Sequence, residues 1–81
     1  MTIRVLLFAV LAQRVGAREL SLRLPDSATV GEALDALCAE HEAIRSMREV
    51  IAFAVDMEYV GRDFLLRDGA ELALISPVSG G

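Results

Sequence analysis

The two glycines that close the sequence, Gly80 and Gly81, are the residues best suited to chemistry. Glycine has no Cβ, so a Gly-Gly end can adopt an extended or left-handed backbone in a narrow channel and present its carboxylate without steric cover. Residues 77–81 span at most about 17 Å, which is enough to enter another protein's active site. The Gly81 carboxylate is therefore the candidate reactive group. The alternative is a frayed terminus of small residues.

Other side chains that could do chemistry are isolated from one another. A single cysteine, Cys38, and a single histidine, His41, cannot supply a structural zinc site, and the sequence has no Ser-His-Asp arrangement or phosphate-binding loop. Cys38 lies on the apolar face of a predicted helix, where a free cysteine acts as a small hydrophobic residue. His41 is expected at the end of that helix. We therefore expect no metal site and no bound cofactor.

The overall composition restricts the kinds of partner. With 81 residues the chain is long enough for one small domain and too short for a deep catalytic cleft. Its net charge of −4 and the lack of a basic run exclude the positive surface that nucleic acids require. All eight basic residues are arginine. Compositional bias of the source genome explains this.

The apolar run from Val5 to Ala12 has the form of a short secretory signal. The run is at the lower length limit of such signals, and its removal would leave too little chain to fold. No stretch of the sequence approaches the length needed to span a membrane. A cytoplasmic location without a membrane partner is therefore expected.

Apolar patterns and turn residues predict five strands. The first segment is rich in β-branched and aromatic residues, and the second alternates leucines with polar residues, as half-buried strands do. Pro77 cannot donate a hydrogen bond to a sheet and should end the last strand. The strands are expected at residues 2–9, 18–24, 50–55, 64–66 and 71–75.

One main helix is predicted between the second and third strands. Thr29 followed by Glu32 matches a capping box, so the helix should begin there and end near His41. Its apolar positions recur every three or four residues and form one buried face. These positions are Val30, Ala33, Leu34, Leu37 and Cys38. A shorter helical segment is expected from Ala9 to Val15, stopped by Gly16.

This order of elements predicts an α+β fold of the β-grasp type, with a mixed sheet packed on one main helix. The first and last strands are expected to be parallel neighbours in the middle of the sheet. Residues 1–76 should form the domain, and residues 77–81 should form a flexible Gly-Gly tail.

The face of the predicted sheet that points away from the helix is expected to bind a partner protein. Strand alternation directs four apolar side chains to this face, which we call the outer apolar patch: Leu6, Phe8, Ala73 and Ile75. Exposed apolar patches usually mark protein interfaces, and this one lies close to the start of the tail. Pro77 and Val78 are expected to join the same interface. The alternative is that the loop of residues 57–66 covers this face.

Three segments resemble the small subunit of molybdopterin synthase, a ubiquitin-like sulfur carrier. They are Val5–Ala9 with Gly16, Leu66–Leu72, and Ser76–Gly81. The resemblance runs through the whole chain in order and is most specific at the two ends. Three positions depart from the family's usual pattern. Ser76 stands where a proline is usual, Asp56 where asparagine is usual, and Ala70 where an acidic residue is usual. None is in the Gly-Gly end, so they bear on the subfamily more than on sulfur carriage.

The resemblance implies a reaction at the Gly81 carboxylate. An adenylating enzyme similar to ubiquitin-activating enzymes would join this carboxylate to AMP from ATP, and sulfur would then displace AMP to give a thiocarboxylate. The large subunit of molybdopterin synthase would pass the sulfur to a pterin precursor, so catalysis would be supplied by the partner. Two alternatives stay open: a carrier for thiamine or another sulfur product, and a non-catalytic β-grasp adaptor.

Overall fold

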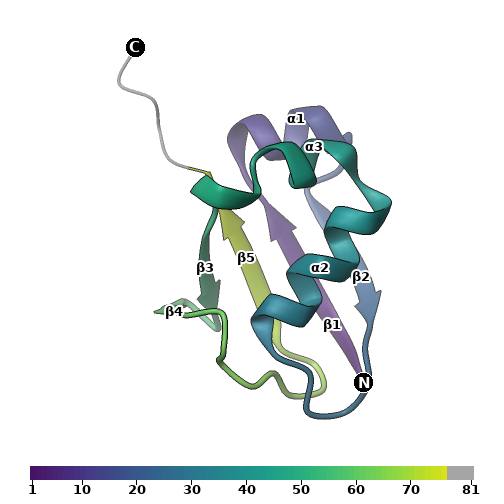
Figure 1. Cartoon of the computed structure of the whole chain (residues 1–81), viewed down its shortest axis with the longest axis vertical. Coiled ribbons are helices and arrows are strands. Elements are labelled where there is room, and N and C mark those ends of the chain that lie inside the picture. The colour runs from purple at the N-terminus through teal and green to yellow at the C-terminus, as the bar shows by residue number, and fades with distance from the viewer. Residues whose placement is uncertain (77–81) are drawn as a thin grey trace.

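The computed structural model describes residues 1–76, which form a five-stranded mixed sheet with α2 packed across one face (Figure 1). The strands are β1 (Thr2–Leu7), β2 (Glu19–Arg23), β3 (Ala52–Val55), β4 (Glu58–Val60) and β5 (Glu71–Ile75). The helices are α1 (Ala9–Val15), α2 (Val30–Glu40), α3 (Glu42–Ser46) and the 3-10 turn η1 (Arg48–Val50). The strand order is β2-β1-β5-β3-β4, with β1 and β5 parallel and the other neighbours antiparallel. The predicted β-grasp fold is confirmed.

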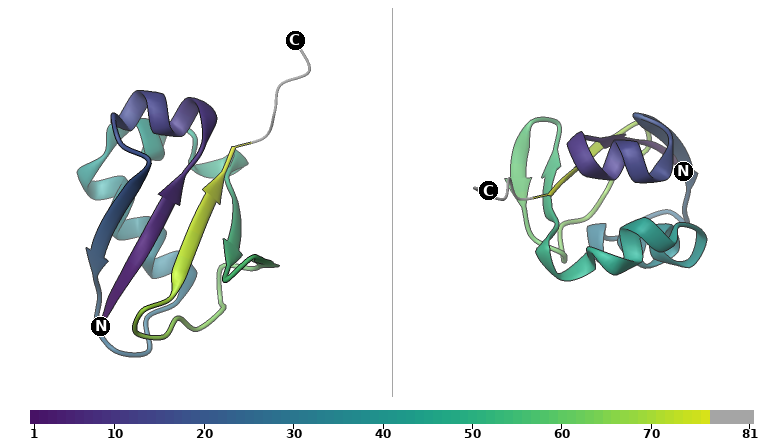
Figure 2. Two further views of the ribbon diagram at one scale, coloured as in Figure 1. Left: turned by 180° about the vertical axis from the view of Figure 1, so that it is seen from behind. Right: turned by 90° about the horizontal axis from the view of Figure 1, so that it is seen from above.

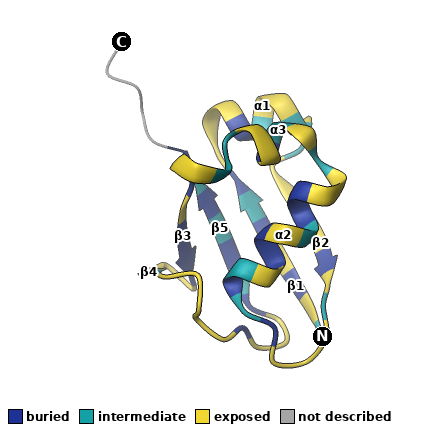
Figure 3. Cartoon of the chain, viewed as in Figure 1, coloured by how far each residue is buried: buried dark blue, intermediate teal, exposed yellow. Residues whose placement is uncertain are grey.

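The hydrophobic core lies between the sheet and α2. Ile3, Val5 and Leu7 of β1 alternate with more exposed neighbours, and all three are buried. Leu72 and Leu74 follow the same pattern on β5. Figure 3 shows buried residues recurring along the two central strands and along α2. Because β1 and β5 are parallel, their carboxyl-terminal ends lie at the same end of the sheet.

Helix α2 begins and ends where the sequence predicts. The Thr29 hydroxyl accepts a hydrogen bond from the Glu32 N–H at 3.2 Å, and the Glu32 carboxylate accepts one from the Thr29 N–H at 2.9 Å. This reciprocal pair is the capping box. The predicted apolar face is buried: Val30, Ala33, Leu34, Leu37 and Cys38. His41 ends the helix, where its N–H donates to the Leu37 carbonyl at 2.8 Å.

Helix α1 lies at the end of the sheet where β1 and β5 terminate (Figure 2). It ends at Gly16, which has a left-handed φ of 85° and whose N–H donates to the Ala12 carbonyl at 2.9 Å. Leu11 is fully buried and anchors the helix to the core. The predicted helical segment from Ala9 to Val15 is therefore confirmed.

The third strand is two residues shorter than predicted. Val50, expected at its start, belongs to η1 instead, and its N–H donates to the Met47 carbonyl at 3.0 Å. β3 therefore begins at Ala52, and the Val50 side chain is exposed. The run from Val50 to Val55 contains no polar residue or glycine that could mark this boundary.

The fourth strand lies earlier in the chain than predicted. Asp56 and Met57 have left-handed φ values of 49° and 75°, which turn the chain so that Glu58 pairs with Val55. The expectation of a strand at residues 64–66 is therefore wrong. That segment makes an isolated bridge to Thr29, outside the sheet. The turn lacks the glycine that marks most hairpins of this kind, so no local signal showed it.

Candidate functional site

The residues predicted to do chemistry, Gly80 and Gly81, lie outside the described residues, as do Pro77 and Val78. The structure does define the point from which they extend, because Ser76 directly follows β5. Ser76 is buried, so this point is held against the domain.

The end of β5 lies between the end of β1 and the start of β3. Leu74 is paired with Leu7 of β1, and Ile75 is paired with Ala52 of β3. Phe8 directly follows Leu7 and therefore lies beside the end of β5. Figure 2 shows these strand ends together at one end of the sheet, next to α1. A segment that continues from β5 thus leaves the domain close to Phe8.

The structure places the residues of the outer apolar patch on, or directly after, the adjacent strands β1 and β5, on the face opposite α2. Its members are Leu6, Phe8, Ala73 and Ile75, and Leu6 is paired directly with Ala73. Phe8 is 48% exposed, and the other three side chains are half-buried. An exposed aromatic side chain beside flat apolar neighbours is typical of a protein-binding surface. Its role as an interface stays a prediction.

The structure adds two residues to this face that sequence reasoning missed. Ala54 of β3 pairs with Ala73, and Tyr59 of β4 pairs with Ala54. An apolar row therefore crosses four strands from Leu6 to Tyr59, which is 75% exposed. Tyr59 joins the row only because of the tight turn between β3 and β4, which the sequence did not reveal.

The loop that follows β4 does not cover the outer apolar patch. Its backbone is joined instead to the start of α2, on the other side of the sheet. The Val30 N–H donates to the Phe64 carbonyl at 3.0 Å, and the Gly31 N–H donates to the Arg62 carbonyl at 2.8 Å. A Cβ at Gly31 would lie 3.3 Å from that Arg62 oxygen, which is a tight contact, so the close approach favours glycine. The alternative that residues 57–66 cover this face is therefore wrong.

A hollow of about 630 Å³ adjoins the patch, between α1 and the neighbouring ends of β1 and β2. Leu6 and Phe8 line both the hollow and the patch, and Arg18 and Glu19 contribute charges of opposite sign to the hollow. A partner that binds the patch could therefore extend into this hollow.

Charged residues on the same sheet face are paired with one another. The Arg4 guanidinium lies 3.1 Å from a Glu19 oxygen and 3.5 Å from a Glu71 oxygen. The hydrogen bond to Glu19, together with the negative charges of Glu19 and Glu71, raises the pKa of Arg4. Arg67 lies 3.9 Å from Asp56. Exposed ion pairs contribute little to stability. Arg4 and Glu71 bound the apolar row on the side away from the end of β5, and Glu19, which pairs with Leu6, bounds it at β2.

Cys38 and His41 occupy structural positions. Cys38 is 4% exposed and packs in the core, as predicted, and His41 ends α2. Within residues 1–76, no group of three or more His, Cys, Asp or Glu residues is arranged to hold a metal ion. In the same part of the chain, no helix is both long and apolar enough to cross a bilayer.

Comparison with known sequences adds independent information. The model of the ThiS family matches residues 5–81, a stretch that includes the terminal glycines. The molybdopterin synthase sulfur carrier subunit of Chlamydomonas reinhardtii is 37% identical over 83 residues, which cover 100% of both chains.

Solved structures agree with the sequence match. The crystal structure of small archaeal modifier protein 1 from Haloferax volcanii has a TM-score of 0.89 and 36% identity, covering 100% of both chains. A chain in a complex of subunits 1 and 2 of molybdopterin-converting factor from Helicobacter pylori has a TM-score of 0.73 at 23% identity, again over both full lengths, and shares the fold. The resemblance found in the sequence is confirmed, and the chain belongs to the ThiS family.

Proposed function

We propose that this protein carries sulfur on Gly81 as the sulfur donor of a molybdopterin synthase. The observation that carries this proposal is the position at which β5 ends, because the segment leading to Gly80 and Gly81 leaves the domain beside the outer apolar patch. A partner that binds the patch is thereby placed to receive the terminus. Membership of the ThiS family and the name of the Chlamydomonas relative support the same function.

The proposed chemistry takes place at one carboxylate. A carboxylate is a poor electrophile, so an adenylating enzyme joins the Gly81 carboxylate to AMP from ATP and releases pyrophosphate. A sulfur nucleophile then attacks the carbonyl carbon and AMP leaves. The resulting thiocarboxylate donates its sulfur to a pterin precursor held by the large subunit. ATP belongs to the activating enzyme, and this chain acts as the sulfur donor with no cofactor of its own.

Two partner proteins follow from this chemistry, the adenylating enzyme and the large subunit. Residues 77–81 span at most about 17 Å, so each partner must bring its active site within that distance of Ser76. We therefore expect both partners to bind the outer apolar patch, with Pro77 and Val78 entering the same interface. The Helicobacter pylori complex of subunits 1 and 2 supports the large subunit as a partner. The cytoplasm, which supplies ATP, is the expected site of this exchange.

A second candidate function is attachment to other proteins. The specific observation in its favour is the match to small archaeal modifier protein 1, which extends over the whole chain at 36% identity. The same adenylated carboxyl would then form an amide with an amine of a target protein and release AMP. Both functions need the same activated Gly81, and they differ in the acceptor.

Intact-mass spectrometry tests the proposal. The chain is incubated with its adenylating enzyme, ATP and a sulfur donor, and replacement of one terminal oxygen by sulfur should add about 16 Da to it. A variant without Gly81 and a reaction without ATP should show no shift. Proteins that instead gain the 8.7 kDa mass of this chain would favour the modifier function. An unchanged mass in the complete reaction would refute sulfur carriage.

A further inference from the structure

This inference rests on the function proposed above, in which the Gly81 carboxyl is activated. Activation creates an acylating group that is covalently joined to the domain of the same chain. An acyl adenylate reacts with unprotonated amines and with thiolates. An acceptor on the same chain would have a high effective concentration. The carrier would therefore lose its activated end to itself unless such groups were kept out of reach.

The reach of the terminus is limited by residues 77–81, which span about 17 Å when fully extended from Ser76. This distance covers the end of β1 and the start of β3, which pair with the end of β5. A strand rises about 3.3 Å per residue, so the opposite ends of β1 and β5 lie beyond the reach of the terminus.

The amine of Met1 is the primary amine of this 81-residue chain, because the sequence contains no lysine. It lies at the opposite end of the sheet, along the strand direction, from the end of β5 (Figure 1). The Gly69 N–H donates to the Thr2 carbonyl at 2.8 Å, which fixes the register of this end of β1. Met1 is thus about eight residues from Ser76 along the strand direction, or roughly 25 Å.

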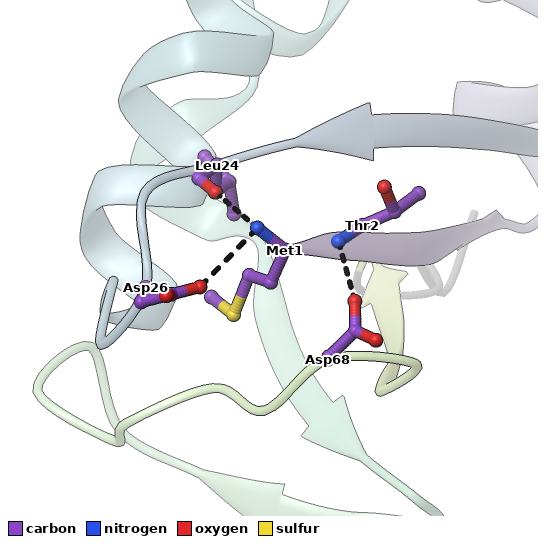
Figure 4. A network of polar contacts seen from close by, with 5 residues as sticks. All are labelled: Met1, Thr2, Leu24, Asp26 and Asp68. Carbon is purple, nitrogen blue, oxygen red and sulfur yellow. Dashed lines mark hydrogen bonds and ion pairs between the residues drawn. The ribbon is translucent and has the colours of Figure 1, made fainter.

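Hydrogen bonds hold this amine in place (Figure 4). It donates to the Leu24 carbonyl at 2.8 Å and lies 3.4 Å from a carboxylate oxygen of Asp26. The next N–H, of Thr2, donates to the Asp68 carboxylate at 2.8 Å. The Met1 amine is therefore distant from the activated carboxyl and is held by these contacts beside Leu24 and Asp26.

The thiol and the cations within or near the reach of the terminus are equally unreactive. Cys38 is 4% exposed and lies in the core between α2 and the sheet. Arg18 lines the hollow beside Phe8, and Arg48 of η1 is paired with Asp35. A guanidinium stays protonated in proteins and presents no lone pair to an acyl group.

We propose that this protein is a donor-only carrier. Its lysine-free sequence and its fold keep every primary amine and thiol of residues 1–76 away from the activated Gly81 carboxyl. The acyl or sulfur group consequently passes only to other molecules, and the chain does not cyclise.

The test uses the 81-residue chain with Gly81 prepared as a thioester of mercaptoethanesulfonate, which activates this one carboxyl without an enzyme. An attacking amine forms a C–N bond to the Gly81 carbonyl carbon, the C–S bond breaks, and the thiol leaves with the proton. An intramolecular amide is then about 18 Da lighter than the hydrolysed chain, and it forms in a unimolecular reaction. A linked dimer has nearly twice the mass.

Two substitutions that conserve charge provide matched controls. Arg18→Lys places an amine near the end of β1, because the Leu7 N–H donates to the Arg18 carbonyl at 2.9 Å. Arg23→Lys places an amine at the other end of β2, where residue 23 pairs with Thr2. We expect the wild-type thioester only to hydrolyse. Arg18→Lys should form the intramolecular amide at least about tenfold faster than Arg23→Lys.

An intramolecular amide from the wild-type thioester would overturn the proposal, as would equal rates of intramolecular amide formation for the two lysine variants. Added glycinamide should be acylated by all three thioesters, which shows that each is a competent donor, and circular dichroism should show the same fold. Since no adenylating enzyme takes part, failure of the sulfur-carrier proposal would leave this result unchanged.

Discussion

Single residues in the turn between β3 and β4 set the extent of the outer face. Asp56 and Met57 both have left-handed φ values, and this turn brings Tyr59 into the apolar row. Asp56 gains support there, because its carboxylate accepts a hydrogen bond from the Glu71 N–H at 3.3 Å. The Met57 side chain is almost fully exposed, so packing offsets little of its backbone strain. Met57 is therefore the position where the turn can be improved.

Met57→Gly should stabilise the domain slightly. A left-handed L-residue costs roughly 1–2 kcal/mol, whereas the added chain entropy of glycine costs roughly 0.5–1 kcal/mol. We expect the free energy of unfolding to rise by about 0.5 kcal/mol, measured by urea denaturation. Met57→Ala keeps the strained backbone and should give no gain. An equal gain from Met57→Ala would show that the methionine side chain, and not the backbone, is the cause.

The arrangement of the elements places the outer apolar patch beside the end of β5. Parallel pairing of β1 and β5 brings Phe8 to the place where residues 77–81 begin. The loop after β4 is joined to α2, which leaves the outer face open within the described residues. Under the proposed function, the sheet itself couples partner recognition to the delivery of Gly81.

Phe8→Asp should weaken binding to the large subunit and to the adenylating enzyme. Phe8 is 48% exposed, so the fold should persist, while a carboxylate at the centre of an apolar interface is unfavourable. We expect the dissociation constant measured by calorimetry to rise by about thirtyfold or more, as for an interface hot spot.

Leu65→Asp is the matched control for Phe8→Asp. Leu65 is 60% exposed, but it bridges to Thr29 at the start of α2 and lies off the outer face. Its dissociation constants should change less than about threefold, as for a residue outside the interface. Equal losses for the two variants, or undiminished binding of Phe8→Asp, would argue against the outer apolar patch as the shared interface.

The whole molecule divides its apolar residues between a core and an open surface. Of the 81 residues, 54% are apolar, and the core uses one face of the sheet together with α2. Adjacent residues of β5 illustrate the division, since Leu74 is fully buried and Ile75 is half-buried on the outer face. A small domain has little stability to spare, so the two faces should respond differently to truncation.

Leu74→Ala should destabilise the domain much more than Ile75→Ala. Removal of a fully buried leucine side chain leaves a cavity and costs about 3 kcal/mol, whereas truncation on the outer face should cost about 1 kcal/mol or less. Urea denaturation of both variants measures the difference. Comparable losses would mean that the outer face contributes to the folding core. In the presence of the large subunit, Ile75→Ala should show the greater defect in binding.

Local patterns in the sequence determined most of the domain. The capping box of Thr29 and Glu32, the alternation along β1 and β5, and the stop at Gly16 each depend on neighbours within a few residues, so each was predictable. The same alternation predicted the members of the outer apolar patch within residues 1–76. The terminal Gly-Gly pair pointed to the proposed chemistry, because that inference depends on residue type and not on the folded structure.

Tertiary structure decided the features that depend on contacts between distant residues. The start of β3, the position of β4 and the place of Tyr59 on the outer face follow from pairing across strands and from a turn without glycine. The path of the loop after β4 depends on backbone hydrogen bonds to Val30 and Gly31, which lie more than thirty residues earlier in the chain. The remote position of the Met1 amine likewise required the register of β1 beside β5. Such pairings are selected by the packing of the whole sheet, and a single segment carries no local record of its partner.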